Sequence, residues 1–244
     1  FAWYLFKSCE KWYHKVVDAL GFGLLTYVGI ACFYTLMHSH DSEPVVKTKP
    51  IEQSVSAGEL VVREEIVYLK GSKTSYTGKA FEIYQNDQKK FEANFKYGKK
   101  HGLETSWYKN GNKQEEAFWK NGEMNGNSVT WHENGQKKNY GLMKSGESVG
   151  LWKMYYENGQ IKAKGNLTNN KQNGLWLGWY ESGSKKFERI YKNGKRDGFG
   201  VAWHENGEKL WDGNFMDDKP VKKSLKFWNS KGETVDSLEE AIAK

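Results

Sequence analysis

The segments WYKNGNKQEEAFWKNGEMNG (residues 107–126) and WHENGQKKNYGLMKSGESVG (residues 131–150) decide the fold, because the second repeats the pattern of the first after 24 residues. In both segments an aromatic pair precedes Asn-Gly, and a glycine closes the segment. The closing glycine keeps this spacing through most of the chain, at Gly78, Gly102, Gly126, Gly150, Gly174 and Gly198. A period of this length is typical of repeat proteins, in which each unit relies on its neighbours to bury its surface.

Each unit contains two turn signals with alternating residues between them. The pair Asn110-Gly111 suits the positive φ angles of a type I′ turn, and Asn121-Gly122 marks the opposite edge of the same unit. Between the two turns, EEAFW alternates polar and apolar residues as strands do. We therefore predict an all-β repeat fold, an elongated single-layer antiparallel meander of 24-residue units, preceded by one transmembrane helix and closed by a short C-terminal helix.

The aromatic pair of each unit falls at equivalent places in this predicted sheet. The first members should form a ladder on one face and the second members should point to the other, because neighbouring strand residues alternate. A single layer has little interior, so we expect these side chains to contact a partner. The candidate partner-binding residues are Trp107, Trp131, Tyr155, Trp179 and Trp203 of the first series and Tyr108, Tyr156 and Tyr180 of the second, where His132 and His204 replace tyrosine.

A membrane anchor is predicted near the start of the chain. The stretch LGFGLLTYVGIACFYTLM (residues 20–37) has no charge, and as a helix it spans about 27 Å, close to the hydrocarbon thickness of a bilayer. We assign a transmembrane helix to residues 19–38. A cleaved signal peptide is the rival reading, but the stretch is long for one and lacks a small-residue cleavage pattern. The predicted membrane-facing side chains are Leu20, Leu24, Val28, Ile30, Phe33 and Leu36.

The remaining segments complete the predicted organisation. Residues 1–18 carry three lysines and several aromatic residues in a helical pattern, which favours an amphipathic lead-in at the membrane interface. By the positive-inside rule, the N-terminus lies in the cytoplasm and the repeats lie outside it, in the periplasm or the extracellular space. An upstream helix would reverse this orientation. Residues 39–58 form a linker, residues 59–220 the repeat array and residues 221–244 a C-terminal cap with capping-box spacing before its helix.

Composition argues against several classes of function. The net charge is +7, but the lysines are scattered and arginine is rare in the repeats, so we predict no nucleic-acid partner. No phosphate-binding glycine loop, metalloprotease motif or nucleophile elbow occurs. Cys9 and Cys32 lie far apart, and His38 and His40 have no third ligand nearby. We therefore predict no catalytic residues, no metal site and no cofactor.

The phrases YTGKAFEIYQNDQKKFEANFKYGKKHG (residues 76–102), WYKNGNKQ (residues 107–114) and YKNGKRDGFGVAWHENGEK (residues 191–209) resemble MORN-type repeats. The resemblance covers about residues 67–218 and is closest to the bacterial variant in YwqK-type antitoxin-like proteins. It implies single-layer, elongated sheets that act as interaction or scaffold modules, sometimes near membranes. The histidines in the second aromatic series depart from this pattern.

These observations favour a non-catalytic, membrane-anchored protein-interaction or scaffold module, an accessory subunit of a larger membrane complex. Its expected partners are the protein subunits of that complex, together with membrane lipid around the transmembrane helix. Three other readings stay open at this point: binding of cell-wall glycan, binding of lipid headgroups through the lysines, and antitoxin-like or immunity-like binding of a protein. A rigid spacer without any partner surface is a further alternative.

Overall fold

The computed structural model describes residues 54–243, which belong to the compact unit Glu52–Lys244, and a second unit comprises Phe1–Ile51. The predicted interfacial segment 1–18, the transmembrane helix 19–38 and most of the linker 39–58 therefore lie outside the described residues. Within the described part of the chain, no helix has the length and apolar character needed to cross a bilayer.

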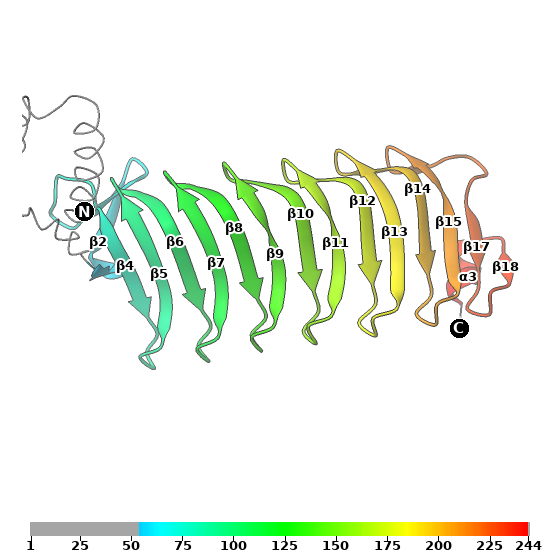
Figure 1. The fold of residues 1–244 in the computed structure, drawn as a ribbon, viewed down its shortest axis with the longest axis horizontal. Helices are drawn as coiled ribbons and strands as arrows, with labels where there is room; N and C mark the ends of the chain where they lie inside the picture. The colour runs from blue at the N-terminus through cyan, green and yellow to red at the C-terminus, as the bar shows by residue number, and fades with distance from the viewer. Residues whose placement is uncertain (1–53, 244) are drawn as a thin grey trace, which may run out of the picture. The chain divides into compact units, whose positions relative to one another are not determined.

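The described residues form one long sheet of 16 strands, and β4 to β15 follow one another in chain order (Figure 1). Each neighbouring pair in this series is antiparallel, which confirms the predicted meander. The strands are β4 Gly78–Ile83, β5 Lys89–Lys96, β6 Lys99–Trp107, β7 Lys113–Lys120, β8 Glu123–Trp131, β9 Lys137–Lys144, β10 Glu147–Tyr155, β11 Ile161–Thr168, β12 Lys171–Trp179, β13 Lys185–Lys192, β14 Lys195–Trp203 and β15 Lys209–Met216.

The two turns of a unit differ in conformation. At the Asn121-Gly122 turn both residues have positive φ angles, 54° and 90°, as a type I′ turn requires. At the Asn110-Gly111 turn only the glycine does, with a φ of 87°, and its N–H donates to the carbonyl of Tyr108 at 3.0 Å. The type I′ prediction for this turn is therefore wrong. The turn is a three-residue loop that ends in a left-handed glycine, and a register shift beside it marks a bulge.

Short elements cap the first strands of the sheet. Strand β1 (Ser54–Ser56) pairs in parallel with β4, and a 3₁₀ turn (Ala57–Glu59) leads into the separate hairpin of β2 (Leu60–Arg63) and β3 (Ile66–Leu69). This hairpin packs on the sheet through a cluster of buried or partly buried apolar side chains. The cluster contains Val55, Tyr76, Ala80, Ala93, Phe95, Leu60, Val67, Leu69 and Phe91.

The other end closes with β16 (Lys219–Pro220), β17 (Lys226–Trp228), β18 (Thr234–Val235) and the helix α3 (Leu238–Ile242). The Ser237 side chain caps α3 by accepting a hydrogen bond from the Glu240 N–H at 3.2 Å, as the sequence predicts. The helix contacts β15, β17 and β18, and Ala241 within it is 1% exposed. The short C-terminal helix is thus confirmed.

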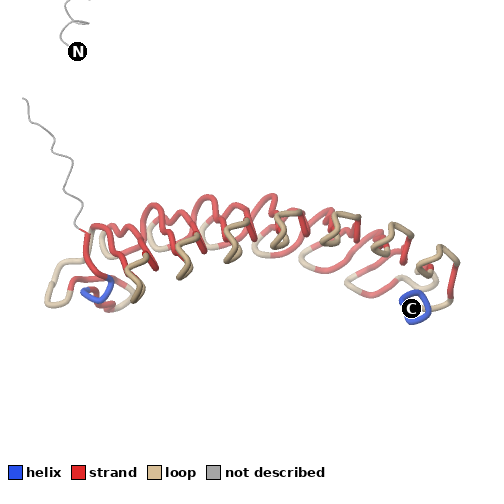
Figure 2. Tube along the Cα trace, turned by 90° about the horizontal axis from the view of Figure 1, so that it is seen from below, coloured by secondary structure: helices blue, strands red, loops and turns tan. Residues whose placement is uncertain are grey.

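The two faces of the sheet differ in how they are packed. On one, which we call the core face, large aromatic side chains lie flat on glycines of the neighbouring strand. Trp176 is 2% exposed there, and a Cβ added at Gly165 would lie 2.3 Å from its indole ring. Trp119, Trp152 and Trp211 share this face by strand alternation. Both capping segments lie on the same side of the curved sheet (Figure 2).

Candidate functional site

The opposite face, which we call the ladder face, carries the first aromatic series. Each member is the last residue of a strand, is half-buried and occupies the equivalent place in its unit: Trp107 in β6, Trp131 in β8, Tyr155 in β10, Trp179 in β12 and Trp203 in β14. The series therefore forms the predicted ladder across the sheet. Its role in binding a partner stays a prediction.

A lysine from the preceding strand lies over most of these rings. The Lys113 ammonium is 5.5 Å from the ring centre of Trp131, and the Lys185 ammonium is 5.1 Å from that of Trp203. Both lysines also form ion pairs with the carboxylate three residues further on, Glu116 and Glu188. A cation above an aromatic face is attracted to the ring electrons, so these two units each combine an aromatic ring, a cation and an anion.

The second aromatic series is used to join one unit to the next. Tyr108 lies in the turn after β6, and its hydroxyl donates to the carbonyl oxygen of Trp131 at 2.8 Å. Tyr108 was expected to point to the face opposite Trp107 by strand alternation, but β6 ends at Trp107, so this alternation does not apply to Tyr108. Equivalent bonds run from Tyr84 to the Trp107 carbonyl, from His132 to that of Tyr155, from Tyr156 to that of Trp179, from Tyr180 to that of Trp203 and from His204 to that of Trp228.

The asparagine of the Asn-Gly pair makes a second link between units. The Asn110 side-chain N–H donates to the carbonyl of Glu133 at 2.8 Å, while its oxygen accepts from the Asn112 N–H at 2.9 Å. Asn134, Asn158 and Asn206 repeat this arrangement. Both recurrent polar groups of the turn are thus occupied by contacts inside the array.

A row of exposed apolar side chains crosses the middle of the ladder face and is interrupted by Asn127 on β8 and Asn166 on β11. Strand register places its members side by side, as in the direct pairs Leu103–Phe118 and Leu175–Ile190. The exposed members, each between 40% and 50% accessible, are Phe118, Leu142, Leu151, Leu175, Ile190 and Phe199, and we call them the apolar row. Sequence reasoning missed this row. Its signal was apolar residues in mid-strand that are separated by multiples of 24 residues, at 118, 142 and 190 and at 151, 175 and 199, with Asn166 as the exception in the first series.

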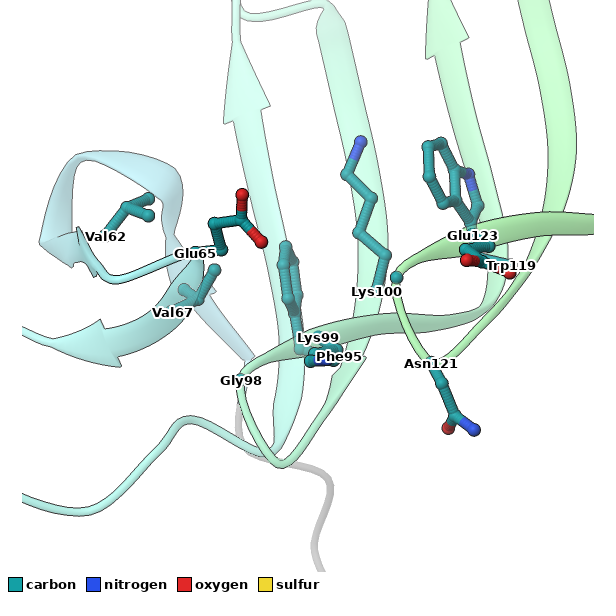
Figure 3. A pocket seen from close by; sticks show the side chains of 11 residues that line it. Val62, Glu65, Val67, Phe95, Gly98, Lys99, Lys100, Trp119, Asn121 and Glu123 are labelled. Carbon is teal, nitrogen blue, oxygen red and sulfur yellow. The ribbon is translucent and has the colours of Figure 1, made fainter. Parts of the chain in front are cut away.

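The core face holds a pocket of about 450 Å³ near the β2–β3 hairpin (Figure 3). Val67 from the hairpin faces Phe95, and Lys100 and Trp119 extend the wall. The Lys100 ammonium is 4.4 Å from the Trp119 ring centre and pairs with Glu104 at 2.7 Å, so the cation is already neutralised within the protein.

Glu115 lies on the core face near Lys100 and Glu104. It is two residues before Ala117, which is the direct cross-strand partner of Glu104. Burial of its carboxyl group, together with the negative charge of Glu104, raises the pKa of Glu115, while Lys100 opposes this effect. Among residues 54–243, no group of three or more His, Cys, Asp or Glu side chains could hold a metal ion.

Comparison with known families agrees with the repeat geometry. The family described as the MORN repeat variant matches residues 100–121, 148–169 and 172–193, which correspond to hairpins β6–β7, β10–β11 and β12–β13. No curated protein matches the chain. The matched segments, together with the meander of repeated hairpins, support a MORN-type repeat protein.

Proposed function

We propose that the chain is a non-catalytic protein-interaction or scaffold module of the YwqK-type bacterial MORN variant, anchored in a membrane as an accessory subunit of a larger complex. The apolar row on the ladder face carries this proposal. It has an exposed apolar side chain on six of the eight strands from β7 to β14, which no other described segment covers, and a large exposed apolar surface usually marks an interaction site. MORN repeats generally serve as protein-binding or lipid-binding modules, in keeping with a non-catalytic role.

The aromatic ladder would extend the same binding surface. The half-buried rings from Trp107 to Trp203 lie on the face that carries the apolar row, at the strand ends. Aromatic side chains are enriched at protein interfaces because a large ring buries much surface with little loss of side-chain freedom. We propose that a partner subunit lies across strands and contacts both the row and the exposed ring edges.

The membrane part of the proposal rests on the apolar stretch within residues 19–38, which lies outside the described residues. We propose that this stretch spans the bilayer with the N-terminus in the cytoplasm and the repeats on the other side. Accessibility of the repeats to protease in spheroplasts, whose cytoplasmic membrane is intact, measures this directly. Digestion in spheroplasts supports the orientation, and digestion only after lysis of the spheroplasts contradicts it.

Purification from detergent tests the interaction itself. The full chain should retain a stoichiometric protein partner, and the double variant Leu151→Glu/Leu175→Glu should lose it because charge is placed in the apolar row. Met216→Glu is the matched control, since Met216 is 64% exposed at the end of β15 and lies outside the row. A chain that purifies alone and monomeric, or a partner that the double variant retains, contradicts the proposal.

A further inference from the structure

A second row of side chains on the ladder face runs beside the apolar row. Direct cross-strand partners join it without a gap from Glu92 in β5 to Asp212 in β15, and we call it the charged row. Its charged members are Glu92, Glu116, Lys153, Lys164, Glu188 and Asp212, and the strands between them contribute Thr105, Val129, Tyr140, Leu177 and Val201. Carboxylates occupy both ends of this row, and lysines occupy its centre.

At both ends of the charged row the carboxylates are neutralised. Glu92 pairs with Lys89 at 2.9 Å, and Asp212 pairs with Lys209 at 2.8 Å. Glu116 and Glu188 are paired in the same way with Lys113 and Lys185. The lysine and its acid are three residues apart in each case, so this ion pair is a recurrent part of the unit.

The centre of the row breaks the pattern. In the unit that starts at β9, Tyr140 stands where four other units have an acid, and in the unit that starts at β11 this place is taken by Lys164. Ile161 stands where the other units have lysine. Lys164 still lies over the ring of the same unit, with its ammonium 5.5 Å from the ring centre of Trp179, but it has lost the carboxylate. Lys153 on β10 is its direct cross-strand partner. Neither lysine forms an ion pair within residues 54–243.

Two unpaired lysines side by side disfavour folding, because like charges directly opposite each other in a sheet repel. Their Cβ atoms are about 5 Å apart in this arrangement, which lets both ammonium groups reach the two oxygens of a single carboxylate. Such charge-assisted hydrogen bonds are about twice as strong as neutral ones. Leu151 is two residues before Lys153 on β10, so its side chain lies on the same face, and it is 49% exposed. An anion held by the two lysines would therefore have an apolar neighbour.

We propose that Lys153 and Lys164 together bind one carboxylate of a protein partner, presented on an extended segment whose neighbouring side chains are apolar and pack on Leu151 and Leu175. This inference rests on the proposed function and names the chemistry of the partner. The carboxylates at both ends of the charged row are already paired with lysines, so the unpaired positive charge of this row is confined to Lys153 and Lys164. Such a local charge favours a discrete acidic segment over an extended layer of anionic headgroups.

A matched pair of peptides tests the proposal on the full chain. The probe is a fluorescein-labelled peptide that alternates leucine with serine around one central glutamate, and its reference carries glutamine instead. We expect the glutamate peptide to bind about tenfold more tightly in fluorescence anisotropy, as a charged hydrogen-bonded contact predicts. High salt and the variant Lys153→Gln/Lys164→Gln should both abolish this preference. The control Lys144→Gln/Lys192→Gln removes two exposed lysines elsewhere and should keep it.

A second variant protects the test against misfolding. Ile161→Lys/Lys164→Glu installs the ion pair that the next unit has between Lys185 and Glu188, so it should fold at least as well as the native chain and still lose the glutamate preference. Equal binding of the two peptides to the native chain overturns the proposal, as does binding to phosphatidylserine vesicles that depends on the same two lysines. If a partner copurifies from detergent but ignores both lysine variants, this inference fails while the proposed function stands.

Discussion

The hydroxyl of Tyr108 donates a hydrogen bond to the carbonyl oxygen of Trp131, 23 residues further along the chain, at 2.8 Å. The same bond recurs at the junctions of Tyr84, Tyr156 and Tyr180, and each acceptor is the backbone at the end of a strand. This bond ties the turn of one unit to the strand of the next. The second aromatic series therefore stabilises the junctions between neighbouring units of the sheet.

Tyr108→Phe should destabilise the array, because it removes the donor and leaves the Trp131 carbonyl unpaired. A neutral hydrogen bond contributes about 1 kcal/mol, which corresponds to a fall in melting temperature of about 2–4 °C for a chain of this size. Thermal unfolding followed by circular dichroism measures the change. Tyr97→Phe is the control, since Tyr97 is 71% exposed and should leave the melting temperature unchanged. Equal melting of both variants would contradict the role of the bond.

His132→Tyr should be tolerated, because His132 already replaces tyrosine in the series and its Nε2 lies 3.0 Å from the Tyr155 carbonyl. The carbonyl only accepts, so this nitrogen carries the proton. His132→Leu should lower the free energy of unfolding by about 1 kcal/mol, since leucine fills the site without a donor. Urea unfolding compares the two variants. A leucine variant as stable as the tyrosine variant would show that packing alone holds this junction.

Gly165→Ala should destabilise the centre of the core face. The added Cβ would lie 2.3 Å from the Trp176 indole, and overpacking of this kind costs about 1–3 kcal/mol. Displacement of the indole should also shift its fluorescence to longer wavelength. Gly58→Ala is the control, because the nearest atom to its Cβ would be 3.6 Å away. Unchanged fluorescence and stability in the Gly165 variant would mean that the sheet adjusts freely there.

Glu115→Gln should stabilise the protein at neutral pH. Burial and the charge of Glu104 raise the pKa of Glu115, so the folded state holds this proton more tightly than the unfolded chain does. The folded state therefore loses stability as pH rises through the range between the two pKa values, and the loss is complete above it. Glutamine removes this effect.

The gain from Glu115→Gln should disappear below about pH 4.3, where an ordinary glutamate is itself protonated in both states. Melting temperatures of the native and variant proteins across this range measure it. Glu116→Gln on the opposite face is the control: it breaks the ion pair with Lys113 and should not stabilise the protein at any pH. A gain from Glu115→Gln that is independent of pH would contradict the assignment.

The sequence was sufficient to predict the architecture of the repeat array, but it did not predict which side chains are packed or exposed on each face of the sheet. The 24-residue glycine spacing predicts the meander, whereas the type I′ turn predicted at Asn110-Gly111 occurs instead at Asn121-Gly122, on the opposite edge of the sheet. The core face was not predicted, although its large side chains follow the repeat: Trp152 and Trp176 are 24 residues apart, and Trp119 and Phe215 are separated by a multiple of 24. The packing of these rings on glycines of a neighbouring strand depends on the register between strands, which periodicity along the chain does not give.

The candidate site was predicted in part for a related reason. The first aromatic series has the expected places, but the contact of Tyr108 with the next unit depends on where the strand ends, and alternation alone does not fix that. The apolar row and the pair Lys153–Lys164 need the register between strands as well. A bulge in each hairpin shifts that register by one residue, which a repeat pattern read along one strand does not reveal.

The junction bond also bears on how such a chain can change in length. Because donor and acceptor always lie one unit apart, excision of a whole unit, such as residues 132–155, would bring Tyr156 to the place of His132 and recreate an equivalent junction. Duplication would do the same. The length of the repeat array can therefore change in evolution by whole units, and each junction between units keeps an equivalent hydrogen bond.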